Sequence, residues 1–187
     1  MESSSQTAID PWMIINGHLI EATVELFGAY GSWLAHAASN EEPTRTETGL
    51  FVIGNAGYKG DGIRGGVTIF AEAPTARALS ARLISDTTDA TLCDTIGEFS
   101  NMLLGRLKNR LLQHDVVLSM ATPTSAIGTW ARVFSAADGI PCWHHFVDEW
   151  WSVFVRLDLT LDRDFAMAAS SDPCASVATE DGDVLLF

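Results

Sequence analysis

The sequence predicts one mixed α/β domain of the α+β type, in which a mainly antiparallel sheet packs against two or three helices. Apolar residues recur at helical spacing in three segments, near residues 11–36, 75–85 and 89–114. Apolar runs joined by turn residues indicate two β-hairpins, over 50–71 and 142–159. At 187 residues, the chain is long enough for one domain with a substantial core.

The first helix is predicted to begin at Pro11 and to continue to about residue 36. Asp10 is suited to cap its N-terminus, and proline is common at the first helical position. The apolar residues that follow at helical spacing are Trp12, Ile15, Leu19, Leu26, Tyr30 and Trp33. Residues 1–9 are expected to be disordered, and residues 38–45 are expected to form a polar loop.

The first hairpin is predicted from strands at residues 50–54 and 63–71, joined by a glycine-rich turn at 57–62. These glycines do not match a nucleotide-binding loop. The sequence GxxxxGK[ST] is missing there, and a strand rather than a helix follows. A glycine-rich hairpin turn is therefore the interpretation.

The second half of the chain is predicted to hold the other two helices, a short strand and the second hairpin. Helix 75–85 follows Pro74, and helix 89–114 leads to a strand at 116–120. Residues 124–139 are ambiguous, with a helical turn considered around Trp130.

The second hairpin joins residues 142–147 to 151–159 across Asp148 and Glu149. From about Phe165 the chain becomes rich in Ala, Ser and Asp. We therefore expect a single domain over residues 10–165 and a flexible acidic tail over 166–187.

The composition argues against several classes of function. A net charge of −13 with only 11 Lys and Arg does not suit binding to nucleic acid. The sequence lacks a run of about 18 apolar residues and a signal peptide, so we expect no membrane span and a cytoplasmic protein. The cysteines, Cys93, Cys142 and Cys174, are odd in number and lack CxxC spacing, which is typical of reduced thiols.

Metal binding and serine hydrolase chemistry are not predicted either. His144 and His145 are adjacent, so on a strand their side chains point to opposite faces. His18, His36 and His114 lack the spacing of metal ligands. No GxSxG sequence is present to place a nucleophilic serine.

The third predicted helix carries an unusual polar face. At about 100° per residue, the following residues fall on one side: Asp94, Gly97, Glu98, Asn101 and Gly105. The opposite side is apolar, with Leu92, Ile96, Phe99, Leu103 and Leu107. A glycine inside a helix costs about 1 kcal/mol relative to alanine. The face is either simply solvated or a surface that another protein approaches closely.

Glu98 and Asn101 suit one kind of chemistry. Paired carboxylates such as Asp94 and Glu98 can act as acid and base, but no pocket accompanies them. A carboxamide, in contrast, can hold a water molecule without titrating, and a nearby carboxylate can pair with a lysine. These two roles suit hydrolysis of a phosphoryl group already activated by a metal ion, where catalysis is mainly positioning of the attacking water.

This pattern resembles the signature of the CheC/CheX/FliY chemotaxis phosphatases. That signature is Asp or Ser, then Glu four residues later, Asn three residues later, and Pro about twenty residues further on. Its residues here are Asp94, Glu98, Asn101 and Pro123, with 21 residues between the last two. Residues 15–23 also resemble the first helix of CheX. The resemblance covers roughly residues 11–160.

The resemblance implies a phosphatase that acts on the phosphorylated aspartate of a CheY-like receiver domain, in chemotaxis or a related two-component circuit. Asn101 would orient the attacking water, and Glu98 would pair with the receiver's lysine. The remaining residues expected at the partner contact are Asp94, Gly97, Gly105 and Pro123. The two glycines would give clearance to the partner's backbone. No cofactor is expected on this chain, since Mg²⁺ would belong to the receiver.

The chain also departs from the family's pattern. CheC carries two motifs, but here Val24 and Gly28 stand where the asparagine of a first-helix motif would be. This places the chain nearer to CheX, which implies a homodimer joined through its sheet. Gly17 stands where the family has a proline in the first helix.

Two other functions stay open at this point: a binding module that holds a receiver without hydrolysis, and a structural homodimeric signalling protein. Residues 178–187 faintly resemble acidic-apolar peptides that tether CheY. A solubilising tail is the alternative for this segment.

Overall fold

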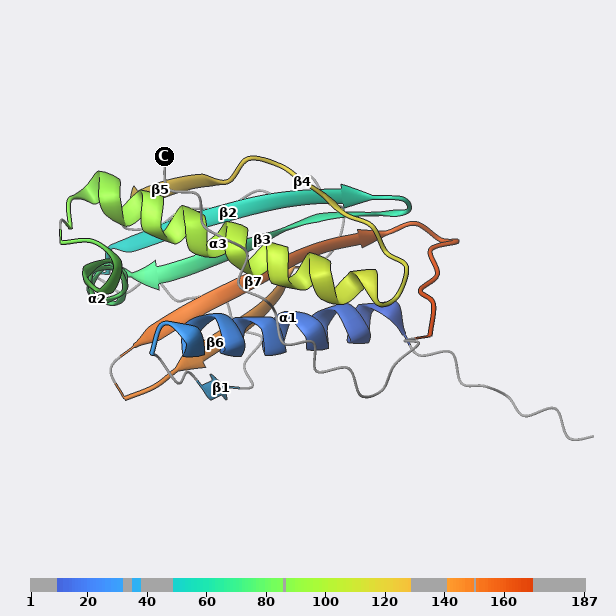
Figure 1. Ribbon diagram of the computed structural model, residues 1–187, viewed down its shortest axis with the longest axis horizontal. Coiled ribbons are helices and arrows are strands. Elements are labelled where there is room, and N and C mark those ends of the chain that lie inside the picture. The colour runs from blue at the N-terminus through green and yellow to red at the C-terminus, as the bar shows by residue number, and fades with distance from the viewer. Residues whose placement is uncertain are drawn as a thin grey trace, which may run out of the picture.

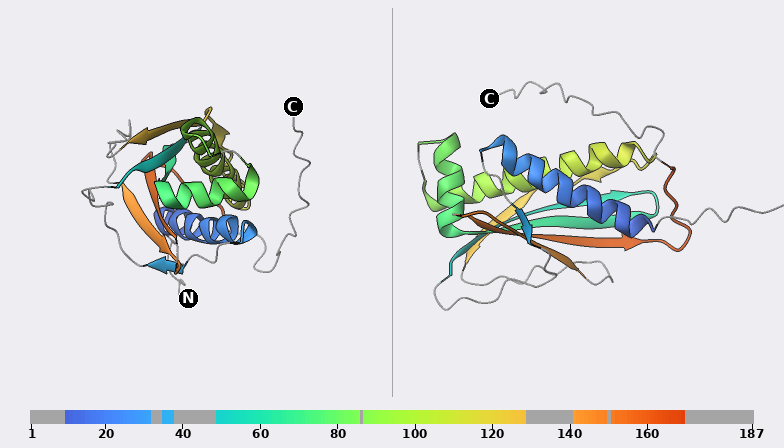
Figure 2. Two further views of the ribbon diagram at one scale, coloured as in Figure 1. Left: turned by 90° about the vertical axis from the view of Figure 1, so that its left-hand side faces the viewer. Right: turned by 90° about the horizontal axis from the view of Figure 1, so that it is seen from below.

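The computed structural model describes residues 10–31, 35–37, 49–85, 87–128, 141–149 and 151–169. Within these ranges, three helices cover one face of a seven-stranded sheet (Figures 1 and 2). The helices are α1 (Pro11–Ala29), α2 (Ala73–Leu83) and α3 (Asp89–Leu112). The strands are β1 (Ala35–Ala37), β2 (Phe51–Gly60), β3 (Ile63–Glu72), β4 (Ser119–Met120), β5 (Thr124–Gly128), β6 (Cys142–Val147) and β7 (Ser152–Leu161).

The described strand pairings are all antiparallel, in the order β1-β6-β7-β3-β2-β4, with β5 also paired to β2. The hairpins β2–β3 and β6–β7 are those predicted, and β3 and β7 join them at the centre of the sheet. The predicted α+β fold class is therefore confirmed. No helix in the described ranges is long and apolar enough to cross a membrane.

Helix α1 is shorter than predicted, because it ends at Ala29 rather than near residue 36. Its start is as expected: the carboxylate of Asp10 accepts a hydrogen bond of 2.9 Å from the backbone N–H of Trp12. At the other end, Gly31 takes a left-handed conformation with φ of 76°, and Arg82 of α2 binds the carbonyl of Tyr30. Trp33 lies outside the described residues, as do residues 1–9 and most of the predicted 38–45 loop.

The first hairpin has longer strands and a tighter turn than predicted. β2 continues to Gly60, and only Asp61 and Gly62 form the turn, with Gly62 at φ of 66°. Gly57 thus lies within the strand rather than in the turn. Further along, β4 is restricted to residues 119–120, and the N–H of Val116, at the start of the predicted strand, bonds to the carbonyl of Leu111 at the end of α3.

Residues 124–128, which the sequence left ambiguous, form strand β5. Their register with β2 places Ser125 opposite Gly54. The strand lies next to α3 (Figure 1). Trp130 lies outside the described residues.

The main core lies between the sheet and the helices. Phe27 of α1 packs against Phe99 of α3 with ring centroids 5.5 Å apart. Thr95 of α3 donates a 3.2 Å hydrogen bond to Ser80 of α2. The register of β2 directs Val52, Gly54, Ala56 and Tyr58 to this side. Helix α3 therefore packs on the sheet and against both other helices.

Beyond β7, the described chain continues to residue 169. The ring Nδ1 of His114 donates to the carbonyl of Ala168 at 2.9 Å, and the N–H of Ala168 donates to the carbonyl of His114 at 3.2 Å. Residues 162–169 are therefore fastened to the C-terminal end of α3. Residues 170–187, and with them most of the predicted acidic tail, lie outside the described residues.

Candidate functional site

Helix α3 forms as its sequence predicts. The hydroxyl of Thr88 accepts a hydrogen bond from the N–H of Thr91, and Asp89 places negative charge in the first turn. The predicted apolar side is buried at Leu92, Ile96, Phe99, Leu103 and Leu107. On the opposite side, Asp94 and Glu98 are exposed and Asn101 is half-buried. The helix therefore presents its polar face outward.

The contact beneath α3 is unusually close. A Cβ built on Gly54 of β2 would lie 2.6 Å from the hydroxyl oxygen of Ser100, and closer still to the carbonyl oxygen of Ile96. Ser100 in turn donates a 3.1 Å hydrogen bond to that carbonyl. Because only glycine leaves this room, Gly54 lets the helix rest directly on β2. This contact fixes the height of the polar face above the sheet.

Glu98 and Asn101 have no partner for their side chains within the described part of the chain: neither forms a hydrogen bond or ion pair there. Helical geometry places them one turn apart, about 4.5 Å along the axis. An exposed carboxylate and a half-buried amide are thus adjacent and available to an external group.

The carboxylates of α1 are in a different state. Arg110 of α3 binds Glu21 at 2.8 Å and Glu25 at 2.5 Å, so both acids have an ion-pair partner within the chain. The sequence found no motif asparagine on α1, and the structure shows that its two glutamates join α1 to α3. Of these acids and Glu98, only Glu98 is left without a cation in the described residues.

The two glycines of the polar face differ in their surroundings. A Cβ on Gly97 would lie 3.6 Å from the Cβ of Ser125, an ordinary van der Waals distance. Gly97 is buried, and its neighbour belongs to this chain's own β5. A Cβ on Gly105 would meet nothing within 4 Å. Open space for another molecule thus lies at Gly105, whereas β5 already covers Gly97.

The other predicted contact residues flank this face. Asp94 is exposed one turn before Glu98, and Pro123 is half-buried in the segment that leads into β5. Ser125, which the sequence did not single out, interacts through its side chain with Cys93 of α3. Burial, together with the nearby Asp94 and Asp89, raises the pKa of the Cys93 thiol. Ser125 lies next to α3 because β5 pairs with β2. This pairing has no local signal in the sequence.

The structure brings together histidines that the sequence left apart. His36 Nε2 lies 3.0 Å from His144 Nδ1, and His144 Nε2 lies 2.7 Å from the Oδ1 of Asn16. His18 Nε2 lies 3.1 Å from His114 Nε2. Within the described ranges, no group of three or more His, Cys, Asp or Glu side chains is arranged to hold a metal ion. These pairs join structural elements.

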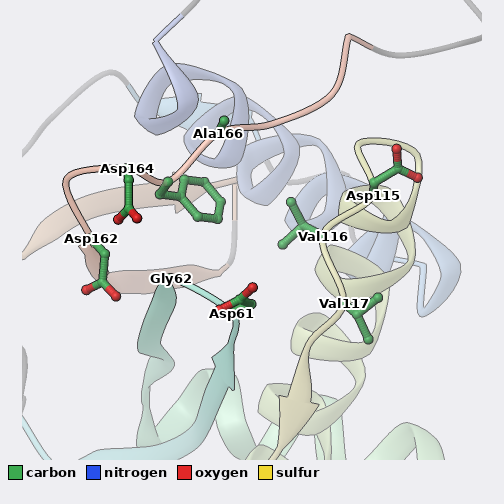
Figure 3. Close-up of a pocket in the computed structure, with 9 residues that line it drawn as sticks. Asp61, Gly62, Asp115, Val116, Val117, Asp162, Asp164 and Ala166 are labelled. Atoms are coloured by element: carbon green, nitrogen blue, oxygen red, sulfur yellow. The ribbon is translucent and has the colours of Figure 1, made fainter.

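A separate hollow of about 470 Å³ lies beyond the C-terminal end of α3, at the β2–β3 turn (Figure 3). Val116, Val117 and Phe165 supply its apolar lining. Its acidic residues are Asp61, Asp115, Asp162 and Asp164, of which Asp162 pairs with Arg64 at 3.4 Å. None of the motif residues lines it, so the hollow is distinct from the polar face of α3.

The fold and the site together define an α+β domain that presents a Glu-x-x-Asn pair on the exposed face of its central helix. Residues 52–138 match the family model described as the chemotaxis phosphatase CheX. This match includes α3 and the segment up to and beyond Pro123. The resemblance to the CheC/CheX/FliY phosphatases inferred from the sequence is thereby confirmed.

Solved structures of similar fold agree with this match. A CheC-like superfamily protein from Shewanella sp. PV-4 has a TM-score of 0.68 at 17% identity, covering 81% of this chain and 99% of that one. The chemotaxis protein CheX from Vibrio vulnificus has a TM-score of 0.67 at 17% identity, covering 78% and 98%. At such identities the likeness establishes the fold.

A third similar structure contains a partner. The CheX–CheY–BeF3–Mg²⁺ complex from Borrelia burgdorferi has a TM-score of 0.57 at 16% identity, covering 78% of this chain and 97% of that one. A search of curated protein sequences finds no significant match to this chain.

Proposed function

We propose that this protein is a phosphatase that hydrolyses the aspartyl phosphate of a CheY-like receiver domain in chemotaxis or related two-component signalling. The observation that carries the proposal is the exposed Glu98–Asn101 pair, which has no partner in the described part of the chain. The match to the CheX family model and the shared fold support it. The similar CheX from Borrelia burgdorferi, solved together with CheY, supports the choice of partner.

The proposed reaction is attack of water on the phosphorus atom of the receiver's aspartyl phosphate. The bond between phosphorus and the aspartate oxygen breaks, which releases inorganic phosphate and a free carboxylate. Asn101 binds the attacking water through its carboxamide and holds it in line with the breaking bond. Because a carboxamide does not titrate, this role does not depend on a proton transfer to Asn101.

Glu98 acts beside Asn101 as an anchor. Its exposed carboxylate pairs with the receiver's lysine next to the phosphoryl group, and this ion pair orients the two proteins. Mg²⁺ is held by the receiver, and this chain contributes no ligand to it. When bound there, the ion neutralises charge on the phosphoryl oxygens. In this scheme the chain supplies position rather than a nucleophile of its own.

The contact surface extends along the polar face of α3. Asp94 lies one turn before Glu98, and Gly105 leaves open space one turn after Asn101. Pro123 shapes the segment next to this face. The contribution of Gly97 is indirect, since its small size lets β5 lie against α3.

We also propose that the protein works in the cytoplasm, where receivers of this class act, and that it forms a homodimer through its sheet. Sedimentation equilibrium at several protein concentrations tests the dimer. A single species with the 20.2 kDa mass of one chain would contradict it.

The test of the proposed function is the decay of a phosphorylated CheY-like receiver from the same genome, measured with and without this protein. We expect the native protein to accelerate the loss of phosphate and Asn101→Ala to abolish the acceleration. Asn101→Ala should still bind a receiver loaded with BeF3 and Mg²⁺, because Glu98 remains. Matched circular dichroism spectra and melting temperatures exclude unfolding as the cause.

The same assay separates the alternatives. Binding of the BeF3-loaded receiver without accelerated decay would identify a non-catalytic binding module. If neither binding nor accelerated decay is found with any receiver of that genome, the polar face serves only a structural homodimer, and the proposal fails.

A further inference from the structure

Strand β5 lies beside the motif as well as in the sheet. It pairs with β2 along Thr124–Gly128, so its side chains alternate between the helix side and the opposite side of the sheet. Ser125 faces α3, because it pairs with Gly54, on which α3 rests. Ala126 pairs with Ile53 and points to the other side.

The side chain of Ser125 occupies a defined place on α3. Its Cβ and Oγ lie 3.6 and 3.7 Å from the position of a Cβ on Gly97, the residue directly before Glu98. Its side chain interacts with that of Cys93, one helical turn before Gly97. Ser125 is nevertheless exposed to solvent, as are Thr124 and Ala126. The side chain of Ser125 thus lies against α3 and remains accessible next to the proposed catalytic pair.

We propose that β5 forms the second wall of the receiver-binding surface, and that the small size of Ser125 sets how closely the receiver approaches Glu98 and Asn101. This inference rests on the proposed function. A Cβ on Gly97 would already be in contact with Ser125, so α3 leaves room for little more than one methyl group on the inward side of Ser125. Additional atoms at position 125 must therefore extend outward, into the space beside Glu98. A receiver that docks on Glu98 meets those atoms first.

Ser125 is a specificity-determining residue in this scheme, and it takes no part in the chemistry. The receiver that fits presents its main chain or small side chains to β5, because no room is left for bulk on both sides. A larger residue at position 125 weakens docking. It leaves hydrolysis within the docked complex unchanged, since Asn101 and its water are untouched.

The experiment compares Ser125→Leu with Ala126→Leu. Both add the same bulk to the same exposed strand, but on opposite sides of the sheet. We expect Ser125→Leu to weaken binding of the BeF3-loaded receiver at least tenfold and to raise KM equally, with kcat within twofold of native. Ala126→Leu should stay within about twofold in both measurements.

Two further results complete the test. If Ser125→Leu does not fold, Ser125→Val, a smaller increase, should raise KM severalfold at an unchanged melting temperature. Native binding by Ser125→Leu, or equal loss in Ala126→Leu, overturns the inference while the Asn101-dependent activity still stands. Absence of receiver binding by the native protein would instead overturn the proposed function.

Discussion

Gly54 of β2 lies directly under the carbonyl oxygen of Ile96 in α3, with no room for a side chain between them. Ile96 belongs to the helical turn that precedes Glu98 and Asn101. The contact is made by backbone on both sides, so it cannot relax by a change of rotamer. It therefore determines where the motif lies relative to the sheet and to β5.

Gly54→Ala should destabilise the protein, because the new methyl group meets the Ile96 carbonyl and the Ser100 hydroxyl. Overpacking of this kind costs about 1–3 kcal/mol. Urea unfolding followed by tryptophan fluorescence measures this loss. Gly97→Ala is the control, since its methyl group would lie 3.6 Å from Ser125 and needs no rearrangement. Equal stability of the two variants would contradict the close contact.

Gly105→Ala should separate stability from function. A Cβ at this position meets nothing within 4 Å, so alanine should raise the free energy of unfolding by about 1 kcal/mol through helix propensity. The same methyl group lies in the space proposed for the receiver, so binding of the phosphorylated receiver should weaken severalfold.

Gly17→Ala is the matched control for Gly105→Ala. Gly17 also lies within a helix, and a Cβ there also meets nothing within 4 Å. It should give the same gain in stability, measured by thermal unfolding, without a change in receiver binding. If Gly105→Ala bound the receiver as tightly as Gly17→Ala does, the open space at Gly105 would have no part in docking.

The features predicted well from the sequence are those with a local cause. Helix α3 has a strong apolar period, so its buried and exposed sides follow from 3.6 residues per turn. The position of its polar face, with Glu98 and Asn101, therefore follows from the sequence without knowledge of any tertiary contact. The fold class followed in the same way from hairpins and helices that are each local in sequence.

The features that were missed depend on contacts between distant segments. The short polar stretch Thr124–Gly128 becomes a strand only because β2 offers it an edge. In the sequence, Gly54 is one of several glycines of the first hairpin, and its special role appears only from the contact with α3. Helix α1 ends at Ala29, although apolar spacing in the sequence continues to Trp33, because Gly31 takes a left-handed conformation and Arg82 of another helix binds the carbonyl of Tyr30.

Arg110→Gln should weaken the contact between α1 and α3 without impairing the phosphatase. Arg110 is largely buried, whereas its partners Glu21 and Glu25 are more than half exposed, so solvent screens the pair. We expect a loss of about 1 kcal/mol in low salt, and less at 0.5 M salt. Thermal unfolding at two ionic strengths measures this, with receiver decay as the second readout. Loss of activity at unchanged stability would show that α1 takes part in the site.

Acid should destabilise the protein through His144, which links three elements. Its Nε2–H donates to Asn16 of α1 and its Nδ1 accepts from His36 of β1, and the second of these bonds needs the neutral ring. Burial, and then the neighbouring His36, lower the pKa of His144 to about 4 from its ordinary value of 6.5. The unfolded chain therefore binds a proton at a higher pH than the folded one does.

It follows that the contribution of His144 to stability is fully present above pH 6.5 and falls as the pH drops from 6.5 to about 4. The loss over this window amounts to a few kcal/mol, at about 1.4 kcal/mol per pH unit. His144→Gln cannot titrate, so its unfolding free energy, measured by urea titration at pH 7.5 and 4.5, should depend less on pH. Burial also lowers the pKa of His145, which stacks on Phe154 on the opposite side of the same strand, so His145→Gln measures the part of the pH dependence that comes from that side. If the pH dependence were as steep in His144→Gln as in the native protein, the buried ring would not be its source.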